Sequence, residues 1–360
     1  MSIYIGSFAA LACIVDAVVY EGMTCLKATL MAIARVFLLL AIAWFGWIQA
    51  PRSAAALESI VIAYPTTSSQ FTPLWFTREV GLYEKYGLDA KLVFIQGGSV
   101  LLQAMLAGQV QAAQNGVAET VTAIVRGGDI RMLGVTAKIF PYSLIAAKSI
   151  KSAKDLIGGR LAINRVGDVS AYGSQLALRK LGLNPDKDVT MLQVGGSPQR
   201  LAALQSGSVQ AAAMDFMSGI RLAKLGFPVL VQLNLNYPYL GPVVTGKLLR
   251  ETPALAESFI KGYVEGIARF KRNREEGIKA LGRYMKSNEV DILNKAYDFI
   301  ANDFYSENLE PEPKSFQDLM EEIGEREPLA KKATIAQVFD LTTVRKLEKE
   351  GFFKTVFKRP

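Results

Sequence analysis

The sequence predicts an α/β fold in which two similar lobes enclose a ligand cleft. Three observations support this prediction. Strand and helix patterns alternate along the chain, one short segment occurs twice at an offset of about 98 residues, and glycine-rich turns stand where strands give way to helices. Such alternation indicates a mainly parallel sheet with helices on both faces. The fold class is therefore α/β, with a cleft between lobes as the expected binding site.

The sequence after residue 57 predicts strands and helices that alternate, with short loops between them. An apolar, β-rich run at 60–64 ends at Pro65, and a polar stretch leads to Pro73, which suits the start of a helix over 73–86. The pattern then predicts strands at 88–96, 110–114 and 130–136 and helices at 99–107 and 117–126. From Pro253 onward, apolar residues recur at spacings of three and four, which predicts helices to about residue 347.

The repeated segment indicates two lobes rather than a solenoid, whose repeats are shorter. Gly-Gly-Ser followed by GQVQAA at 108–113 is echoed by Gly-Gly-Ser followed by GSVQAA at 207–212. We expect one lobe to comprise 57–137 with 238–360 and the other 138–237. The crossovers are expected near 139–141 and near Tyr237-Pro238, because proline favours extended connections.

The first 56 residues have the order of a secretory signal peptide. Lys27 and Arg35 precede an uncharged run at 36–47, and the small residues Ser-Ala-Ala-Ala follow at 53–56. We therefore predict cleavage after Ala56 and a periplasmic mature chain. The alternative is an uncleaved membrane anchor, obtained by extending the apolar run backward through Arg35.

Composition narrows the chemistry further. The chain has no histidine, and its two cysteines, Cys13 and Cys25, both lie in the predicted leader. Serine–histidine and cysteine–histidine catalysis and histidine metal sites are thereby excluded, and we expect no cofactor and no metal. The densest basic cluster, at 271–274, lies in a helical pattern and reads as a solvated helix face, so we expect no nucleic-acid partner.

Three glycine-rich turns are candidate ligand contacts. They lie at 97–99, 167–170 and 195–197, each between a predicted strand and a predicted helix. Backbone N–H groups and the helix dipole at such points favour anions, although simple helix caps have the same sequence pattern. The carboxylates Glu119, Asp168 and Asp215 could face the cleft, but helix capping or surface exposure is the preferred interpretation of each.

Longer motifs carry a resemblance to a known family. The segment PLWFTREVGLYEKYGLD at 73–89, the segment IKSAKDL at 150–156 with GGRLAI at 158–163, and the two G-x-V-Q-A-A turns resemble solute-binding proteins of the nitrate/sulfonate/taurine class of ABC importers, including those that bind thiamine-pyrimidine precursors. The resemblance implies a type II periplasmic-binding fold. Gln111 and Gln210 replace the aspartates usual in the family, and no proline follows Asp215-Phe216-Met217.

Carried over position by position, the resemblance implies ligand contacts in one loop and at four strand-to-helix junctions. These candidates are Thr66, Thr67, Ser68, Gln70, Gly98, Ser99, Asn115, Gly116, Val117, Gly167, Asp168, Ser170, Asp215 and Phe216. Arg165 joins them because it ends a predicted strand two residues before one of the turns. Arg200 follows the turn at 195–197 by three residues and is a second candidate anion donor on the same cleft wall, but it lies inside a predicted helix, so exposure to solvent is its preferred interpretation. Losing a charge-assisted contact costs about 1.5–3 kcal/mol, so Arg165→Ala should weaken anion binding roughly 10- to 150-fold, and Ser170→Ala less.

The function that follows is capture of a small anionic or aromatic-acid solute by hinged lobe closure and its delivery to an ABC permease. We expect a monomer without enzymatic activity. The alternatives are an enzyme on the same fold, either a pyrimidine synthase or a lyase, and a membrane-anchored sensory ectodomain. The synthase alternative is disfavoured because those relatives use a histidine and a cysteine-rich motif, which the mature chain lacks.

Overall fold

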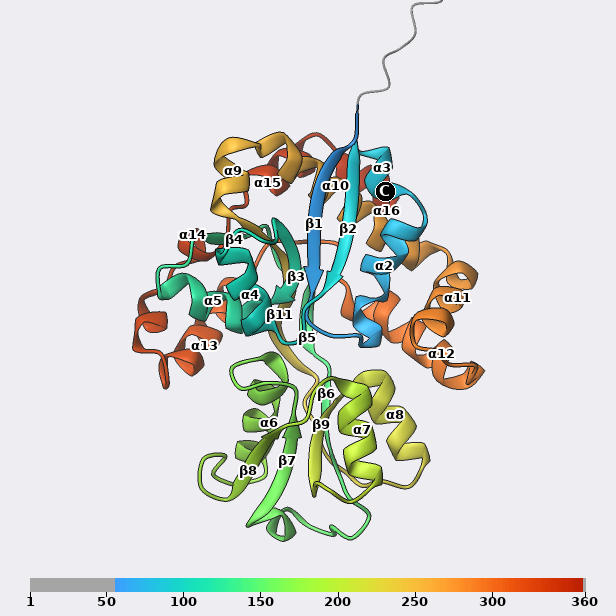
Figure 1. The fold of residues 1–360 in the computed structure, drawn as a ribbon, viewed down its shortest axis with the longest axis vertical. Helices are drawn as coiled ribbons and strands as arrows, with labels where there is room; N and C mark the ends of the chain where they lie inside the picture. The colour runs from blue at the N-terminus through green and yellow to red at the C-terminus, as the bar shows by residue number, and fades with distance from the viewer. Residues whose placement is uncertain (1–55, 359–360) are drawn as a thin grey trace, which may run out of the picture. The chain divides into compact units, whose positions relative to one another are not determined.

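The computed structural model describes residues 56–358, which build two β-sheets with helices packed against them (Figure 1). The predicted signal peptide lies outside the described residues, apart from Ala56. Within the described part of the chain, no helix is long and apolar enough to cross a membrane.

The first sheet has six strands. They are β1 (Glu58–Tyr64), β2 (Leu88–Phe94), β3 (Ala112–Gly116), β4 (Ile130–Met132), β5 (Ala137–Phe140) and β11 (Leu235–Thr245). The order is β2-β1-β3-β11-β4, and β5 also pairs with β11. Strand β1 runs parallel to β2 and β3, whereas β11 is antiparallel to β3, β4 and β5.

The second sheet has five strands. They are β6 (Tyr142–Ala146), β7 (Gly159–Ile163), β8 (Val189–Gln193), β9 (Ala211–Asp215) and β10 (Val229–Gln232), in the order β10-β6-β9-β7-β8. Strand β7 is parallel to β8 and β9, and β6 is antiparallel to β9 and β10. The prediction of mainly parallel sheets therefore holds only for β1 to β3 and for β7 to β9. Every pairing of β6 and β11, which begin where the chain changes sheet, is antiparallel, including those with β4 and β10.

The helices between these strands follow the predicted alternation, with one break. They are η1 (Ser69–Phe71), α2 (Thr72–Glu79), α3 (Leu82–Lys85), α4 (Gly98–Leu106), α5 (Val117–Val125), η2 (Ala153–Leu156), α6 (Val169–Lys180), α7 (Ser197–Gln205) and α8 (Phe216–Lys224). The helix predicted at 73–86 is divided, because Gly81 adopts a left-handed conformation with φ of 71°. Glycine allows that conformation without strain, and it ends α2 in the usual way.

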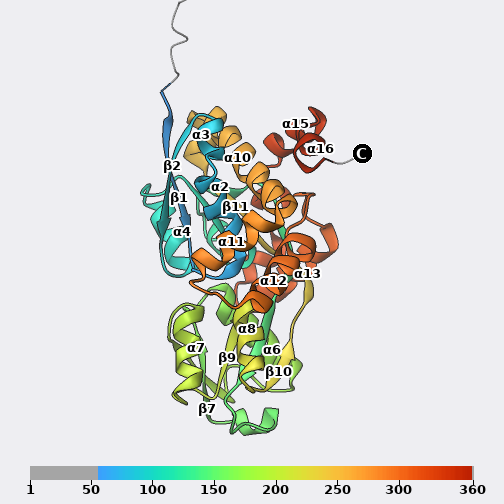
Figure 2. The ribbon, with the colours of Figure 1, turned by 90° about the vertical axis from the view of Figure 1, so that its right-hand side faces the viewer.

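The carboxy-terminal region is helical, as predicted. It contains α9 (Gly246–Glu251), α10 (Pro253–Arg272), α11 (Arg274–Tyr284), α12 (Val290–Asp298), the π-helical turn η3 (Phe299–Phe304), α13 (Pro313–Gly324), η4 (Pro328–Lys332), α14 (Ile335–Val338), α15 (Thr342–Lys349) and α16 (Phe352–Phe357). Figure 2 shows α10 beside α2 and α3, and α12 and α13 at the level where the two sheets meet. This region packs against the first sheet, for example through α13 and β11, and its helix α12 also contacts α8, which belongs with the second sheet.

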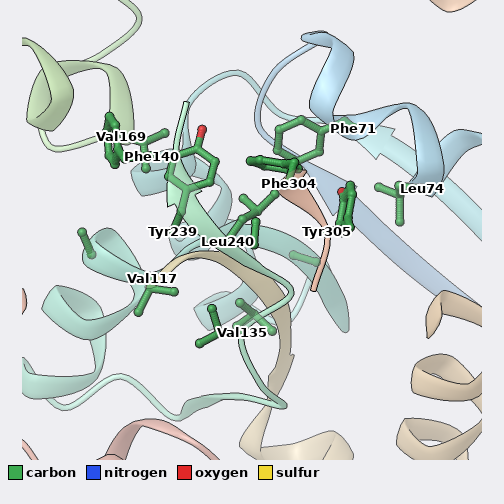
Figure 3. Packing of buried hydrophobic residues seen from close by; sticks show 14 of the residues in the cluster. Phe71, Leu74, Val117, Val135, Phe140, Val169, Tyr239, Leu240, Phe304 and Tyr305 are labelled. Carbon is green, nitrogen blue, oxygen red and sulfur yellow. The ribbon is translucent and has the colours of Figure 1, made fainter. Parts of the chain in front are cut away.

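Two strand connections carry the chain between the sheets. The chain leaves the first sheet at Pro141, between β5 and β6, and returns between β10 and β11, so that Tyr237 and Pro238 lie within β11. Aromatic side chains surround this crossing. The Phe140 ring lies 5.1 Å from the ring of Tyr239, which is 5.8 Å from the ring of Phe304 (Figure 3). The crossing is thus held by buried ring packing.

The two repeated segments occupy matching places in different sheets. The first leads into β3 and the second into β9. Gln111 Oε1 accepts a hydrogen bond of 2.9 Å from Val61 N in β1, and Gln210 Oε1 accepts one of 2.8 Å from Arg160 N in β7. The glutamines that stand in place of aspartates therefore tie each repeat to its neighbouring strand.

Candidate functional site

Five helices begin at the turns that the sequence singled out. Helix α4 starts at Gly98 and α5 follows Gly116, both from the first sheet. Helices α6, α7 and α8, from the second sheet, follow Asp168, Gly196 and Asp215. The amino-terminal ends of helices carry partial positive charge and unpaired N–H groups, which favour negatively charged ligands.

Turns from the two sheets touch one another. Arg165, after β7, donates a hydrogen bond of 2.9 Å from Nε to the carbonyl oxygen of Gln96, after β2. A β-carbon on Gly97 would come within 2.5 Å of Arg165 Cδ, and one on Gly116 within 2.6 Å of Val169 Cγ1. Glycine at these two positions allows the close approach. These contacts bring the turns after β2 and β3 of the first sheet against the turn after β7 of the second.

Glu119 is a buried acid, and its predicted role as a helix cap or an exposed residue is wrong, because its carboxyl group neither caps α5 nor reaches the surface. It lies in the first turn of α5, is 5% exposed, and packs against Gly98, where a β-carbon would overlap its Oε1. No side chain of the described residues donates a hydrogen bond to its carboxyl group. Burial raises the pKa of Glu119 to about 8, and the nearby Asp168 carboxylate adds to this shift.

Asp168 and Asp215 act as helix caps. Asp168 Oδ1 accepts hydrogen bonds from Ser170 N and Ala171 N, at 3.0 and 3.1 Å, and from Ser170 Oγ at 2.7 Å. Asp215 accepts from Ser218 N and Ser218 Oγ. These bonds agree with the helix-cap interpretation of both aspartates, and they occupy the hydroxyl of the candidate residue Ser170.

The loop before α2 presents buried polar groups. Ser68 and Gln70 are 3% and 0% exposed, and neither side chain has a hydrogen-bond partner among residues 56–358; the same holds for Asn115 Oδ1. Tyr305 fixes this loop, because its hydroxyl donates to Gln70 O at 2.8 Å and accepts from Gln114 Nε2 at 2.6 Å. Buried polar groups are normally paired, so such a group of unpaired ones indicates a ligand site.

Arg200 is a buried arginine at the start of α7. Its expected exposure to solvent is wrong, because the side chain is 1% exposed. Its guanidinium donates to Gly195 O at 3.0 Å and Ser197 Oγ at 3.2 Å, its Nε has no partner, and no ion pair among the described residues includes it. The small residues of the turn Gly195–Ser197 were the available signal, since they leave space for a side chain one helical turn later.

The remaining candidates differ in accessibility. Val117 is fully buried in the hydrophobic core, and Phe216 stacks on Phe299 of η3 with ring centroids 3.9 Å apart. Thr66, Thr67, Ser99 and Gly167 are at least partly exposed.

A cavity of about 270 Å³ adjoins Glu119, Gly167 and Asp168. Because it reaches residues of both sheets, small molecules have room beside the facing turns.

The sequence matches a known protein family. Residues 68–276 match the family described as NMT1/THI5 like, which is more than half of the chain. This chain belongs to that family. A Brucella abortus protein named as a binding protein is 23% identical over 225 residues, covering 61% of this chain and 69% of its own length.

Solved structures of other proteins share the fold. The alkanesulfonate-binding protein SsuA from Xanthomonas axonopodis, bound to MOPS, has a TM-score of 0.64 at 17% identity, covering 80% of this chain and 98% of SsuA. The desulfurization enzyme DSZB has a TM-score of 0.56 at 15% identity, covering 81% of this chain and 99% of the enzyme. The same fold thus occurs in a binding protein and in an enzyme.

Proposed function

We propose that this chain is the solute-binding component of an ABC importer, which captures a small organic anion outside the cytoplasmic membrane and hands it to the permease. The observation that carries the proposal is Arg200, a buried guanidinium without a carboxylate partner. A buried charge is costly unless it is paired, so an anionic ligand would supply the missing partner. The family match and the binding proteins among the similar structures support the same function.

The proposed mechanism is closure of two lobes on the solute. We assign 57–137 with 238–360 to one lobe and 138–237 to the other, with hinges at the two connections between the sheets. Short connections of this kind can absorb the changes in backbone angle that domain closure requires. The contact between Arg165 and Gln96 O would form on closure, which gives Arg165 a part in closing the lobes rather than in holding the anion.

The hydrogen bonds that the buried carboxylates make favour a binding function over a catalytic one. Asp168 and Asp215 each accept hydrogen bonds that cap a helix, which leaves them poorly placed to exchange protons with a substrate. Glu119 has a raised pKa and lines the cavity, where it can take part in a hydrogen bond with a solute. The site therefore offers fixed hydrogen-bonding groups for recognition.

The test starts with native mass spectrometry of gently purified protein, which gives the mass of any co-purified solute. Calorimetry with that solute, or with methanesulfonate and nitrate as probes, then compares variants. Arg200→Gln should weaken binding roughly 10- to 150-fold, because a charge-assisted contact is worth about 1.5–3 kcal/mol. Arg200→Lys, which keeps the charge, should retain part of the affinity.

The control is Arg160→Gln, which removes an exposed arginine in the same half of the chain. It should bind as the unmodified protein does. Full affinity in a folded Arg200→Gln variant, or a cationic co-purified solute, would contradict the anion proposal and leave the general solute-binding function in place. Conversion of the solute into a product by the purified protein would favour the enzyme alternative.

A further inference from the structure

The cavity of about 270 Å³ lies between helices that belong with different sheets. Helix α5 packs against β3, α6 packs against β7, and α13 contacts β11. Its wall includes Glu119 and Thr122 of α5, Tyr172 and Gln175 of α6, and Glu322 and Ile323 of α13. An apolar cavity of about 150 Å³ can hold benzene, so this one has room for a six-membered ring with a small polar group. A molecule bound there would touch parts of the chain that belong with both sheets.

Part of the cavity wall is apolar. Ile163 of β7, Met191 of β8 and Ile323 of α13 supply hydrocarbon surface. Burial of carbon atoms against such surface is favourable in proportion to the area removed from water. The cavity therefore favours a ligand that has an apolar body.

The arginines that line the cavity are already paired. Arg126 Nε lies 2.6 Å from Glu327 Oε2, and Arg179 Nη1 lies 3.2 Å from Glu322 Oε1. Arg326 also has a carboxylate partner, at 2.7 Å. An anionic ligand would have to displace these carboxylates, and a cationic ligand would face three guanidinium groups. The cavity therefore suits an uncharged polar group.

The two remaining acids of the cavity differ in their hydrogen bonding. The Asp168 carboxylate accepts hydrogen bonds from the backbone N–H groups of Arg165, Ser170 and Ala171. Glu119 is 5% exposed, and no side chain of the described chain donates to its carboxyl group. A buried acceptor of this kind costs free energy until a donor pairs with it. Glu119 is therefore the point at which the cavity calls for a donor on the ligand.

The Tyr172 hydroxyl supplies a donor to the same cavity. It is buried and makes no hydrogen bond of normal geometry within residues 56–358. Burial and the nearby Glu322 carboxylate raise the pKa of Tyr172, so the hydroxyl keeps its proton. A ligand carbonyl could accept from this hydroxyl while a ligand N–H donates to Glu119. A carboxamide offers both functions in one uncharged group.

We propose that this cavity is a second binding site, for an uncharged small molecule in which a carboxamide is attached to an apolar ring or chain. Glu119 accepts a hydrogen bond from the amide N–H, and the Tyr172 hydroxyl donates to the amide oxygen. Arg200 does not line this cavity, so the site is separate from the proposed anion contact. Because elements of both sheets form the wall, a ligand bound there would favour the closed arrangement of the lobes.

The experiment compares four aromatic probes by calorimetry on the full chain. Benzamide carries the proposed group, N,N-dimethylbenzamide lacks the N–H donor, and benzoate and benzylammonium carry a negative and a positive charge. We expect benzamide to bind most tightly of the four. Equal or tighter binding of any other probe, or no binding of benzamide, would overturn the carboxamide site. These results leave the anion proposal untouched, because that proposal is tested with other probes and at another residue.

Two pairs of variants locate the site. Glu119→Leu removes the acceptor, whereas Glu119→Gln keeps it. A hydrogen bond between neutral groups changes affinity roughly 2- to 12-fold, so benzamide should bind more weakly to Glu119→Leu than to Glu119→Gln by that factor. Gln175→Trp fills the cavity from α6 and should abolish binding. Lys180→Trp, at an exposed residue of the same helix outside the cavity, should retain it.

Thermal unfolding shows whether each variant is folded. If Glu119→Leu does not fold, the pair of tryptophan variants on α6 still decides whether benzamide enters this cavity. Equal benzamide affinities within either folded pair would overturn the proposal.

Discussion

At the scale of single residues, the most informative side chain is Glu119. It is a carboxylic acid packed against two glycines, and the Asp168 carboxylate, from the other sheet, acts on it electrostatically. Tyr237 and Tyr239 also interact electrostatically with it, and neither carries a positive charge. Burial without a cation favours the protonated form, so the folded chain binds a proton that the unfolded chain releases near pH 4.5.

This proton predicts how stability depends on pH. The folded-state pKa of about 8 is above the ordinary value of 4.5, so the contribution of Glu119 is fully present below pH 4.5 and is lost as the pH rises toward 8. The loss can reach about 1.4 kcal/mol per pH unit within that window. Glu119→Gln, which cannot ionise, should therefore be more stable than the unmodified chain at pH 8 and nearly equal at pH 4.5.

Urea unfolding at pH 4.5, 6 and 8 measures this difference. Glu84→Gln, a change at an exposed glutamate, serves as the control and should leave the pH dependence unaltered. A Glu119→Gln variant whose stability follows the same pH curve as the unmodified chain would show that Glu119 is ionised in the folded state.

The sequence predicted the positions of the turns better than the directions of the side chains. Glycine-rich strand-to-helix junctions are local features, so Gly98, Gly116 and Gly167 were recognisable as site candidates. The burial of Arg200 was not recognisable, because polar and apolar residues are not clearly divided between two faces of α7. Only the packing of this helix shows which face is buried. Arg165 illustrates the same limit, since its partner is a backbone oxygen 69 residues away.

At the scale of elements, local pattern located the helices and strands closely. The predicted helices at 99–107 and 117–126 correspond to α4 and α5, and the strand predicted at 60–64 corresponds to β1. The antiparallel strands β6 and β11 were not predicted as such, because strand direction depends on where the chain crosses between sheets. The repeated glutamines were noticed, but their bonds to β1 and β7 required the three-dimensional structure.

These bonds lead to a prediction about the repeat. Removing the acceptor by Gln111→Ala or Gln210→Ala leaves a strand N–H group unpaired and should lower the free energy of unfolding by about 0.5–1.5 kcal/mol in each case. Because the two glutamines lie in different sheets, the double variant should lose about the sum of the two.

Chemical denaturation of the single and double variants measures these losses. Gln109→Ala is the matched control, since Gln109 is exposed and stands two residues before Gln111. Equal stability of Gln111→Ala and Gln109→Ala would mean that water replaces the lost acceptor at no cost.

At the scale of the whole described chain, the two sheets are connected by more than the crossing strands. Helix α8 of the second sheet contacts the region of α12 and η3. Arg221 Nε donates to Glu289 Oε1 at 2.7 Å, Arg221 Nη2 donates to Ser287 Oγ at 3.0 Å, and Phe216 stacks on Phe299. If the two sheets belong to lobes that separate, these contacts must break, so they bias the chain toward the closed arrangement before any solute binds.

The last prediction concerns that bias. Arg221→Ala removes both hydrogen bonds and the ion pair to Glu289 but leaves the candidate ligand contacts unchanged. Both charged side chains are partly exposed, so the pair contributes at most about 1 kcal/mol, equivalent to roughly a fivefold shift from closed to open. Small-angle X-ray scattering of solute-free protein should show a larger radius of gyration for Arg221→Ala. In the unmodified chain, added salt should move the radius in the same direction, because salt screens the pair.

Lys314→Ala, which breaks an ion pair within α13, should leave the radius unchanged. An Arg221→Ala variant with the radius and salt response of the unmodified chain would mean that the α8 contact does not hold the lobes together.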